Sequence, residues 1–161
     1  MAFLPFRQQP PAPVLPGGFE LHGDHTPSAQ AINSLLASCS EATPPAERWS
    51  AALERSYGYL CILESNSGEL VGFVRITSDQ ALNANLWDLL ADPTDPGQAK
   101  VLAVLVHAAV ARLRREVGGC SISLSARPEA VAALVKVGFI VDPGGIRAMG
   151  LDLRTRNRPR D

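Results

Sequence analysis

Residues 84–109 read ANLWDLLADPTDPGQAKVLAVLVHAA and contain the change of pattern that decides the fold. The first part is mostly apolar, which predicts a buried strand. Pro93, Pro96 and Gly97 end that strand, and the apolar spacing that follows indicates a helix from Gly97 or Gln98 to about Val117. Free backbone N–H groups at the start of a helix attract anions. This strand, turn and helix therefore have the layout of a phosphate-binding site.

Length and composition indicate one globular domain. The chain has 161 residues, of which 46% are hydrophobic and 19% are charged. A net charge of −1 gives no general attraction to nucleic acid, and no apolar stretch is long enough to cross a membrane, so neither partner is expected. Cys39, Cys61 and Cys120 lack the spacing of a metal site, so no metal is expected. These cysteines and the lack of a signal peptide predict a reducing compartment, the cytoplasm or an organelle stroma.

Apolar periodicity and turn residues predict an α+β protein built on a mixed sheet. Two early helices are expected to begin at the caps Thr26 and Thr43, because each precedes a proline. Strands 85–91 and 120–125 are joined by a helix, so they are expected to be parallel neighbours. The expected strands are 19–22, 57–63, 70–77, 85–91, 120–125, 139–141 and 146–153, and the later helices are 97–117 and 128–137.

The two ends of the chain differ in composition from the rest. Residues 1–17 are rich in proline and are expected to form an extended arm, which is mobile, or is anchored on a protein partner or on the domain itself. Residues 154–161 form a basic tail that is expected to be disordered. The folded domain is predicted to cover residues 18–153.

The order of elements and several short segments resemble the GNAT superfamily of N-acetyltransferases, in particular its cyanobacterial and plastid members. The segments are 68–75 (GELVGFVR), 86–93 (LWDLLADP), and 137–139 (VGF) followed by 142–146 (DPGGI). The resemblance implies a three-layer α/β arrangement, the acyl-CoA N-acyltransferase fold. In this fold a mixed, mostly antiparallel sheet has a central parallel strand pair that splays apart, and helices cover both faces.

The resemblance also implies acetyl-CoA as cofactor, with its pyrophosphate held at the turn before the long helix. The family signature Arg/Gln-x-x-Gly-x-Gly/Ala corresponds here to residues 96–101 (PGQAKV), so the motif is degenerate. Pro96 replaces the Arg or Gln, and Val101 brings a β-branched side chain to the second glycine position. If Val101 points into the helix packing, the amides remain free for the cofactor. The implied cofactor-binding residues are Leu89, Leu90, Ala91, Gly97, Gln98, Ala99, Lys100, Val101 and Leu102.

Acetyl transfer to an amine requires a group that removes a proton and a group that protonates the leaving thiolate. Asp88 is the best candidate for the base, because it lies on the strand where the family often places a carboxylate; it is alternatively a structural side chain that bonds a nearby loop. The family's helix tyrosine corresponds to Leu134, which has no hydroxyl. Tyr59 is a weaker catalytic candidate, and a strand tyrosine is also a common core residue.

Two functions from different classes remain open at this stage. The first is an N-acetyltransferase that moves the acetyl group of acetyl-CoA to an amine of a small molecule or protein. The second is a catalytically degenerate GNAT-fold protein that acts as a binding or regulatory module. The retained element order favours the first, and the changes at Pro96, Val101 and Leu134 favour the second.

Overall fold

The structure, a computed structural model, describes residues 11–145 of the chain. Five strands form one sheet in the order β1-β2-β3-β4-β5. The strands are β1 (Phe19–His22), β2 (Gly58–Glu64), β3 (Leu70–Ser78), β4 (Asn83–Ala91) and β5 (Ser121–Ser123). The helices are α1 (Ala29–Ser38), α2 (Ala46–Glu54), α3 (Gln98–Glu116) and α4 (Val131–Lys136), with short 3-10 segments at Pro128–Ala130 and Pro143–Gly145.

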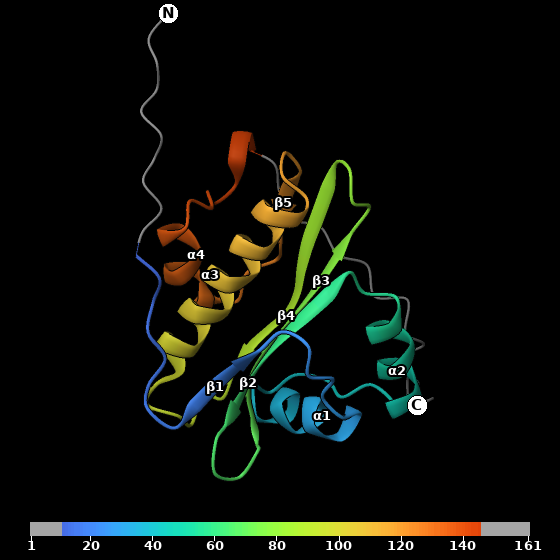
Figure 1. The fold of residues 1–161 in the computed structure, drawn as a ribbon, viewed down its shortest axis with the longest axis vertical. Helices are drawn as coiled ribbons and strands as arrows, with labels where there is room; N and C mark the ends of the chain where they lie inside the picture. The colour runs from blue at the N-terminus through green and yellow to red at the C-terminus, as the bar shows by residue number, and fades with distance from the viewer. Residues whose placement is uncertain (1–10, 146–161) are drawn as a thin grey trace, which may run out of the picture.

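The sheet is mixed and lies between two layers of helices. β1 to β4 pair antiparallel, and β4 pairs with β5 in parallel through α3. Figure 1 shows α3 and α4 on one face of the sheet and α1 and α2 on the other. The predicted α+β class, the helices on both faces and the parallel pair are therefore confirmed.

Each face of the sheet carries its own core. The larger core joins α3 and α4 to side chains such as Ile62, Val74 and Leu86. The smaller core joins α1 and α2 to Phe73 and Leu90, and Ile32 and Trp49 are buried in it. Because β3 contributes side chains to both cores, this strand holds the two helical layers in register.

Both early helices begin two or more residues later than the sequence predicted. The cap of α1 is Ser28, whose Oγ accepts a hydrogen bond from the Ala31 amide. Thr26 instead pairs its hydroxyl with Tyr59 at 2.6 Å. The residue that caps α2 is Pro45, which makes no side-chain bond. Here the structure uses the hydroxyl of Thr26 to join a loop to the sheet rather than to begin a helix.

The carboxyl-terminal part of the domain also differs from the prediction. β5 covers only Ser121–Ser123, and residues 139–141 are not a strand. The parallel pair therefore lies at the edge of the sheet within the described residues, while the expected strand 146–153 and the tail 154–161 lie outside them. At the other end, Leu15 packs against the larger core, so this part of the expected arm contacts the domain. Residues 1–10 are not described.

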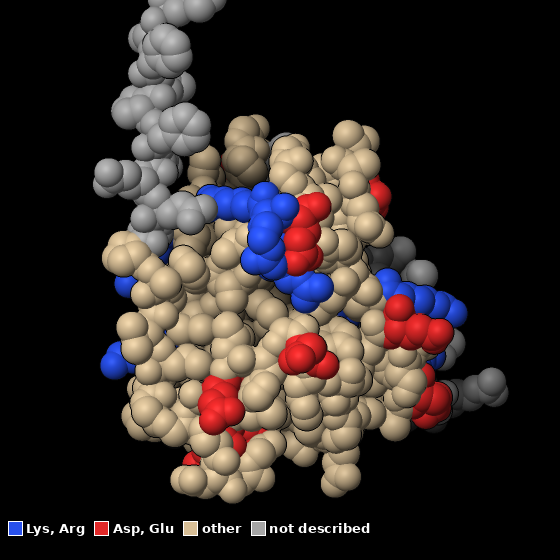
Figure 2. Space-filling view, in the orientation of Figure 1, with Lys and Arg blue, Asp and Glu red and all other residues tan. Residues whose placement is uncertain are grey.

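Some of the surface charges of the described residues occur in pairs of opposite sign. Figure 2 shows basic and acidic side chains next to one another on the face that it presents. One such group lies at the end of α3, where Arg112 and Arg115 pair with Glu116 at 3.0 and 2.7 Å. None of the helices in the described part of the chain has the length and apolar character needed to cross a bilayer.

The helix α3 approaches the sheet closely at one glycine. Gly72 on β3 faces Val101, and a Cβ added at Gly72 would lie 2.5 Å from Val101 Cγ1 and 3.1 Å from Leu105 Cδ1. Val101 is 1% exposed. The side chain that departs from the family signature therefore fills the space that Gly72 leaves, and it points into the core.

We predict that Gly72→Ala destabilises the domain by roughly 1–3 kcal/mol, because the added methyl overpacks this contact. Val101→Ala alone removes buried methyl groups and also destabilises. In the double variant the two changes compensate in part, so their effects on the free energy of unfolding are not additive. Urea unfolding measures all three variants. Gly17→Ala, where no atom lies within 4 Å of the added Cβ, is the control. Strict additivity would contradict the packing described here.

The turn that leads into β4 is organised by one carboxylate. Asp79 Oδ1 accepts hydrogen bonds from the amides of Ala81, Leu82 and Asn83 at 2.8–2.9 Å. These bonds lower the pKa of Asp79 from 3.8 to about 2. The ionised carboxylate is the better acceptor of these amide hydrogen bonds, so the turn is stabilised while Asp79 is ionised.

We predict that Asp79→Asn lowers the melting temperature at neutral pH and that the difference from the wild type shrinks as the pH falls. A carboxyl group with a lowered pKa in the folded state stabilises the fold above its unfolded pKa of 3.8, and this contribution is lost between that pH and about 2. Thermal unfolding of both proteins from pH 7 to pH 2 measures the effect. A difference that stays constant down to pH 2 would show that the charge is not the cause.

Candidate active-site cleft

The two parallel strands separate after a short paired region. Their pairing runs from Asn83 with Ser121 to Asn85 with Ser123, and β4 then continues alone to Ala91. In the described part of the chain, no strand pairs with this side of β4 beyond Asn85. The predicted splay is therefore present, and its open edge lies at the carboxyl ends of two parallel strands, where α/β proteins commonly bind ligands.

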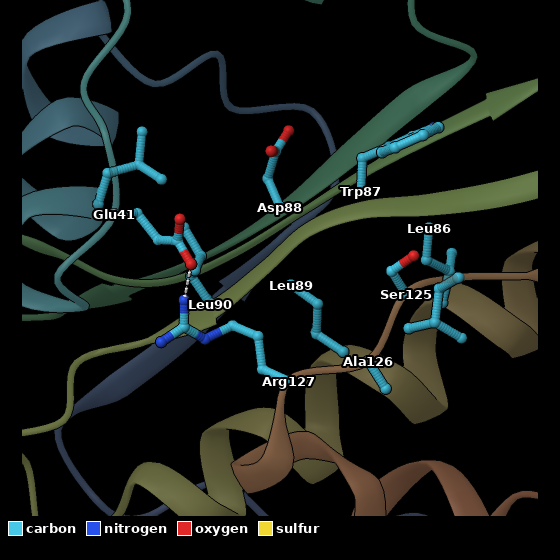
Figure 3. A pocket seen from close by; sticks show the side chains of 11 residues that line it. Glu41, Leu86, Trp87, Asp88, Leu89, Leu90, Ser125, Ala126 and Arg127 are labelled. Carbon is cyan, nitrogen blue, oxygen red and sulfur yellow. Dashed lines mark hydrogen bonds and ion pairs between the residues drawn. The ribbon is translucent and has the colours of Figure 1, made fainter. Parts of the chain in front are cut away.

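A cleft of about 200 Å³ occupies the space between the separated strands. One wall is β4, the second is the segment that follows β5, and the end of α1 closes a third side. Figure 3 shows Asp88, Trp87 and Leu89 on β4, with Ser125 and Arg127 across from them. The lining residues are Leu36, Glu41, Leu86, Trp87, Asp88, Leu89, Leu90, Leu124, Ser125, Ala126 and Arg127.

The wall formed by β4 contains a bulge at Asp88. Phe73 pairs with Leu90 and Arg75 pairs with Trp87, so Asp88 and Leu89 together oppose the single residue Val74. Asp88 has a φ of 53°, a conformation that Asp tolerates better than most other residues. The extra residue interrupts the alternation of side chains, and bulges are a common means of redirecting a side chain at a functional site.

The Asp88 carboxylate is held by a neighbouring strand. Arg75 Nε donates to Asp88 Oδ2 at 2.8 Å, and the two side chains are 17% and 24% exposed. Arg75 Nη1 also approaches Ser56 Oγ at 3.4 Å. Asp88 is part of the cleft lining and therefore carries a partly buried, oriented carboxylate, which has the chemistry of a general base for an ammonium group.

The second catalytic candidate, Tyr59, lies outside the cleft. Tyr59 packs beside Phe73 in the smaller core, with 6.4 Å between the ring centroids, and its hydroxyl bonds Thr26. It does not line the cleft. Leu134, at the family's tyrosine position, is buried in the larger core. The hydroxyl that does line the cleft belongs to Ser125, whereas Ser123 Oγ is bonded to Asn85 Oδ1 at 2.6 Å.

The start of α3 keeps only part of the expected amide cradle. Gly97 N donates to Asp95 Oδ1 at 2.5 Å, and Gln98 N donates to Asp95 O at 3.1 Å. Lys100 and Val101 donate to Gly97 O. Among the described residues, the Ala99 amide has no acceptor, and both Ala99 and the Lys100 side chain are exposed. One amide and one ammonium group are thus available to an anion at this turn.

The residues that the resemblance assigned to the cofactor fall into three groups. Leu89 and Leu90 line the cleft, while the carbonyl of Ala91 accepts from Gln98 Nε2 at 3.3 Å. Gly97 to Lys100 form the turn at the start of α3. Val101 and Leu102 are buried in the larger core, so only their backbone is near the turn. Because Val101 points away, it does not occupy the space beside that turn.

Sequence reasoning missed Arg127 and Glu41. Arg127 precedes Pro128 just after β5, and Glu41 lies in the loop after α1. Their ion pair crosses the cleft, as Figure 3 shows. The available signal was topological, since the residues that follow both strands of a parallel pair meet at one edge of the sheet. Nothing in the local sequence near Glu41 pointed to this edge.

Comparison with known proteins agrees with this geometry. No family model matches the sequence. A solved structure from meticillin-resistant Staphylococcus aureus, a protein of unknown function described as a probable acetyltransferase, superimposes with a TM-score of 0.73 at 17% identity and covers 83% of this chain and 98% of its own. The fold is therefore that of the GNAT acyl-CoA N-acyltransferases.

The sequence is also similar to proteins named as N-acetyltransferases. The chain is 34% identical over 108 residues to the uncharacterized N-acetyltransferase ycf52 of Porphyra purpurea, across 65% of this chain and 60% of that protein. It is 41% identical over 81 residues to the chloroplastic GCN5-related N-acetyltransferase 2 of Arabidopsis thaliana, across 50% of this chain and 31% of that protein. These relatives and the fold support a member of the GNAT superfamily of plastid type, and the chain spans less than two thirds of the length of these two relatives.

We predict that Arg75 and Asp88 are coupled by about 1 kcal/mol, because the pair is partly shielded from solvent. Asp88→Asn and Arg75→Gln each lower the free energy of unfolding, and the double variant costs less than the sum of the two. A double-mutant cycle from denaturant unfolding gives the coupling. A value near zero would mean that Arg75 does not hold the carboxylate in solution.

Proposed function

We propose that this chain is an acetyl-CoA-dependent N-acetyltransferase whose acceptor is an amine of a small molecule or a protein. The observation that carries the proposal is the open cleft between β4 and the segment after β5, with the Asp88 carboxylate in its wall. The burial of Val101 supports it further, because this residue leaves the turn before α3 accessible. The sequence relatives named as N-acetyltransferases favour this function over a purely binding module.

Different residues of the cleft have different roles in the proposed acyl transfer. Acetyl-CoA supplies the acetyl group as a reactive thioester. The unpaired side of β4 from Leu86 to Leu90 offers backbone groups along the cleft, and the Ala99 amide with Lys100 offers positive charge at the turn. Asp88 accepts the proton of the acceptor ammonium, and Arg75 keeps the carboxylate oriented. The free amine attacks the thioester carbonyl, the C–S bond breaks as the C–N bond forms, and the leaving thiolate takes its proton from water. The apolar side chains of Leu36, Leu86 and Leu89 limit water in the cleft.

The proposal extends to the place of action. A chloroplastic relative supports a plastid stroma, and the cytoplasm is the alternative that three cysteines without a disulfide also fit. In the described part of the chain Cys39 and Cys61 are buried, and burial raises the pKa of Cys61 to about 12, so this thiol stays protonated.

We predict that the protein binds acetyl-CoA and that Asp88→Asn lowers the rate of acetyl transfer by about 100-fold, the low end for losing a general base. Asparagine keeps the shape and tolerates the positive φ, so acetyl-CoA affinity stays the same. Calorimetric titration measures binding, and a free-thiol assay with a panel of amines measures transfer. Tyr59→Phe is the control, because Tyr59 lies outside the cleft.

Two outcomes would count against the proposal. Absence of acetyl-CoA binding would remove the enzymatic function. Full activity in the Asp88→Asn protein would leave the function in place and remove Asp88 as the base.

A further inference from the structure

The guanidinium of Arg127 makes three contacts with three different parts of the fold. Nε donates to Glu129 Oε1 at 2.6 Å, Nη2 donates to the carbonyl of Cys39 at 3.1 Å, and Nη1 pairs with Glu41. Arg127 lines the cleft, and in Figure 3 its side chain reaches toward Glu41 beside Leu90. It is the basic side chain among the described lining residues.

Two of these contacts hold the guanidinium in place. Glu129 is two residues along the same segment, so its carboxylate and Nε belong to one wall of the cleft. The Cys39 carbonyl belongs to the end of α1, and Cys39 Sγ lies 3.5 Å from the carbonyl of Ala91 on β4. Nη1 therefore keeps its position in the cleft whether or not Glu41 is present, which is the preorganisation that tight anion binding requires.

The third contact is the one that a ligand can replace. Glu41 lies on the loop between α1 and α2, and its side chain is 48% exposed. Ion pairs this exposed contribute only about 0–1 kcal/mol, so displacing Glu41 has a small cost. A guanidinium donates to a phosphate or carboxylate with the same planar geometry that it uses for Glu41.

We propose that Arg127 is a ligand-binding residue of the cleft, that its Nη1 binds an anionic oxygen of the ligand, and that Glu41 occupies this position until the ligand enters. The inference rests on the proposed function, under which the anion is a phosphate of the acyl donor. The position fits, because Cys39 and Gln98 both contact the Ala91 carbonyl and so connect Arg127 to the start of α3. Arg127 thereby supplies a cation near a turn where Pro96 supplies none.

The test compares two ligands in five proteins. The ligands are CoA, which carries phosphates, and acetyl-pantetheine, which carries none. The proteins are the wild type, Glu41→Gln, Arg127→Gln, Arg127→Lys and the control Arg112→Gln, which removes an ion-paired arginine outside the cleft. Calorimetry gives the affinities, and melting temperatures confirm that each variant is folded.

We expect Glu41→Gln to tighten CoA binding about 3-fold and Arg127→Gln to weaken it about 10-fold, since one change removes the competitor and the other removes a charge-assisted bond. Arg127→Lys restores the affinity in part, Arg112→Gln has no effect, and acetyl-pantetheine binds all five proteins equally. If CoA affinity is unchanged and Arg127→Gln raises KM only for acceptors that carry a carboxylate, the same site binds the acceptor's anion instead.

Other results overturn the inference. Tighter CoA binding in both Glu41→Gln and Arg127→Gln would mean that the ion pair only blocks the cleft. If Arg127→Gln changes neither the affinity for CoA nor the KM of any acceptor, Arg127 has no role in ligand binding. If the wild type does not bind CoA, the proposed function fails, and inorganic pyrophosphate then tests the inference alone. Binding of pyrophosphate to Glu41→Gln but not to the Glu41→Gln/Arg127→Gln double variant supports an anion site, and binding to neither overturns it.

Discussion

The structure depends on the loss of strand pairing along one edge of β4 after Asn85. Up to that residue the backbone of β4 is paired on both sides, and beyond it only β3 remains as a partner. Backbone N–H and C=O groups in a partly buried strand require partners, so an unpaired strand edge in the middle of a fold is a place for solvent or ligand. The bulge at Asp88, the cleft and the approach of Arg127 are all arranged around this edge.

The sequence predicted the elements whose apolar pattern was long or regular. The hairpin β2–β3, strand β4 and helix α3 lie within one or two residues of their expected bounds, because periodicity reports burial directly. The caps of α1 and α2 were wrong, since a hydroxyl before a proline has other uses, as Thr26 shows with Tyr59. The expected strand at 139–141 has too few residues for periodicity to distinguish it from an apolar loop.

The sequence predicted where the candidate site lies but not all of the residues that form it. Asp88 stood out because it lies on the strand where the family often places a carboxylate, and the structure makes it part of the cleft lining. The meaning of Val101 depended on Gly72, which is 29 positions away in sequence and in contact with it in space. Arg127 and Glu41 meet only because β4 and β5 separate, so no pattern in either segment alone reveals the pair.

The backbone conformation of Asp88 limits which substitutions evolution can accept at this position. At a φ of 53° the residues that fit without strain are glycine, asparagine and aspartate, and of these only aspartate takes up a proton. Most replacements at this position therefore disturb the bulge, while the two that preserve it lack the carboxylate that we propose as the base. A descendant that lost the chemistry by either of those routes would retain the cleft, the fold and the ability to hold a ligand.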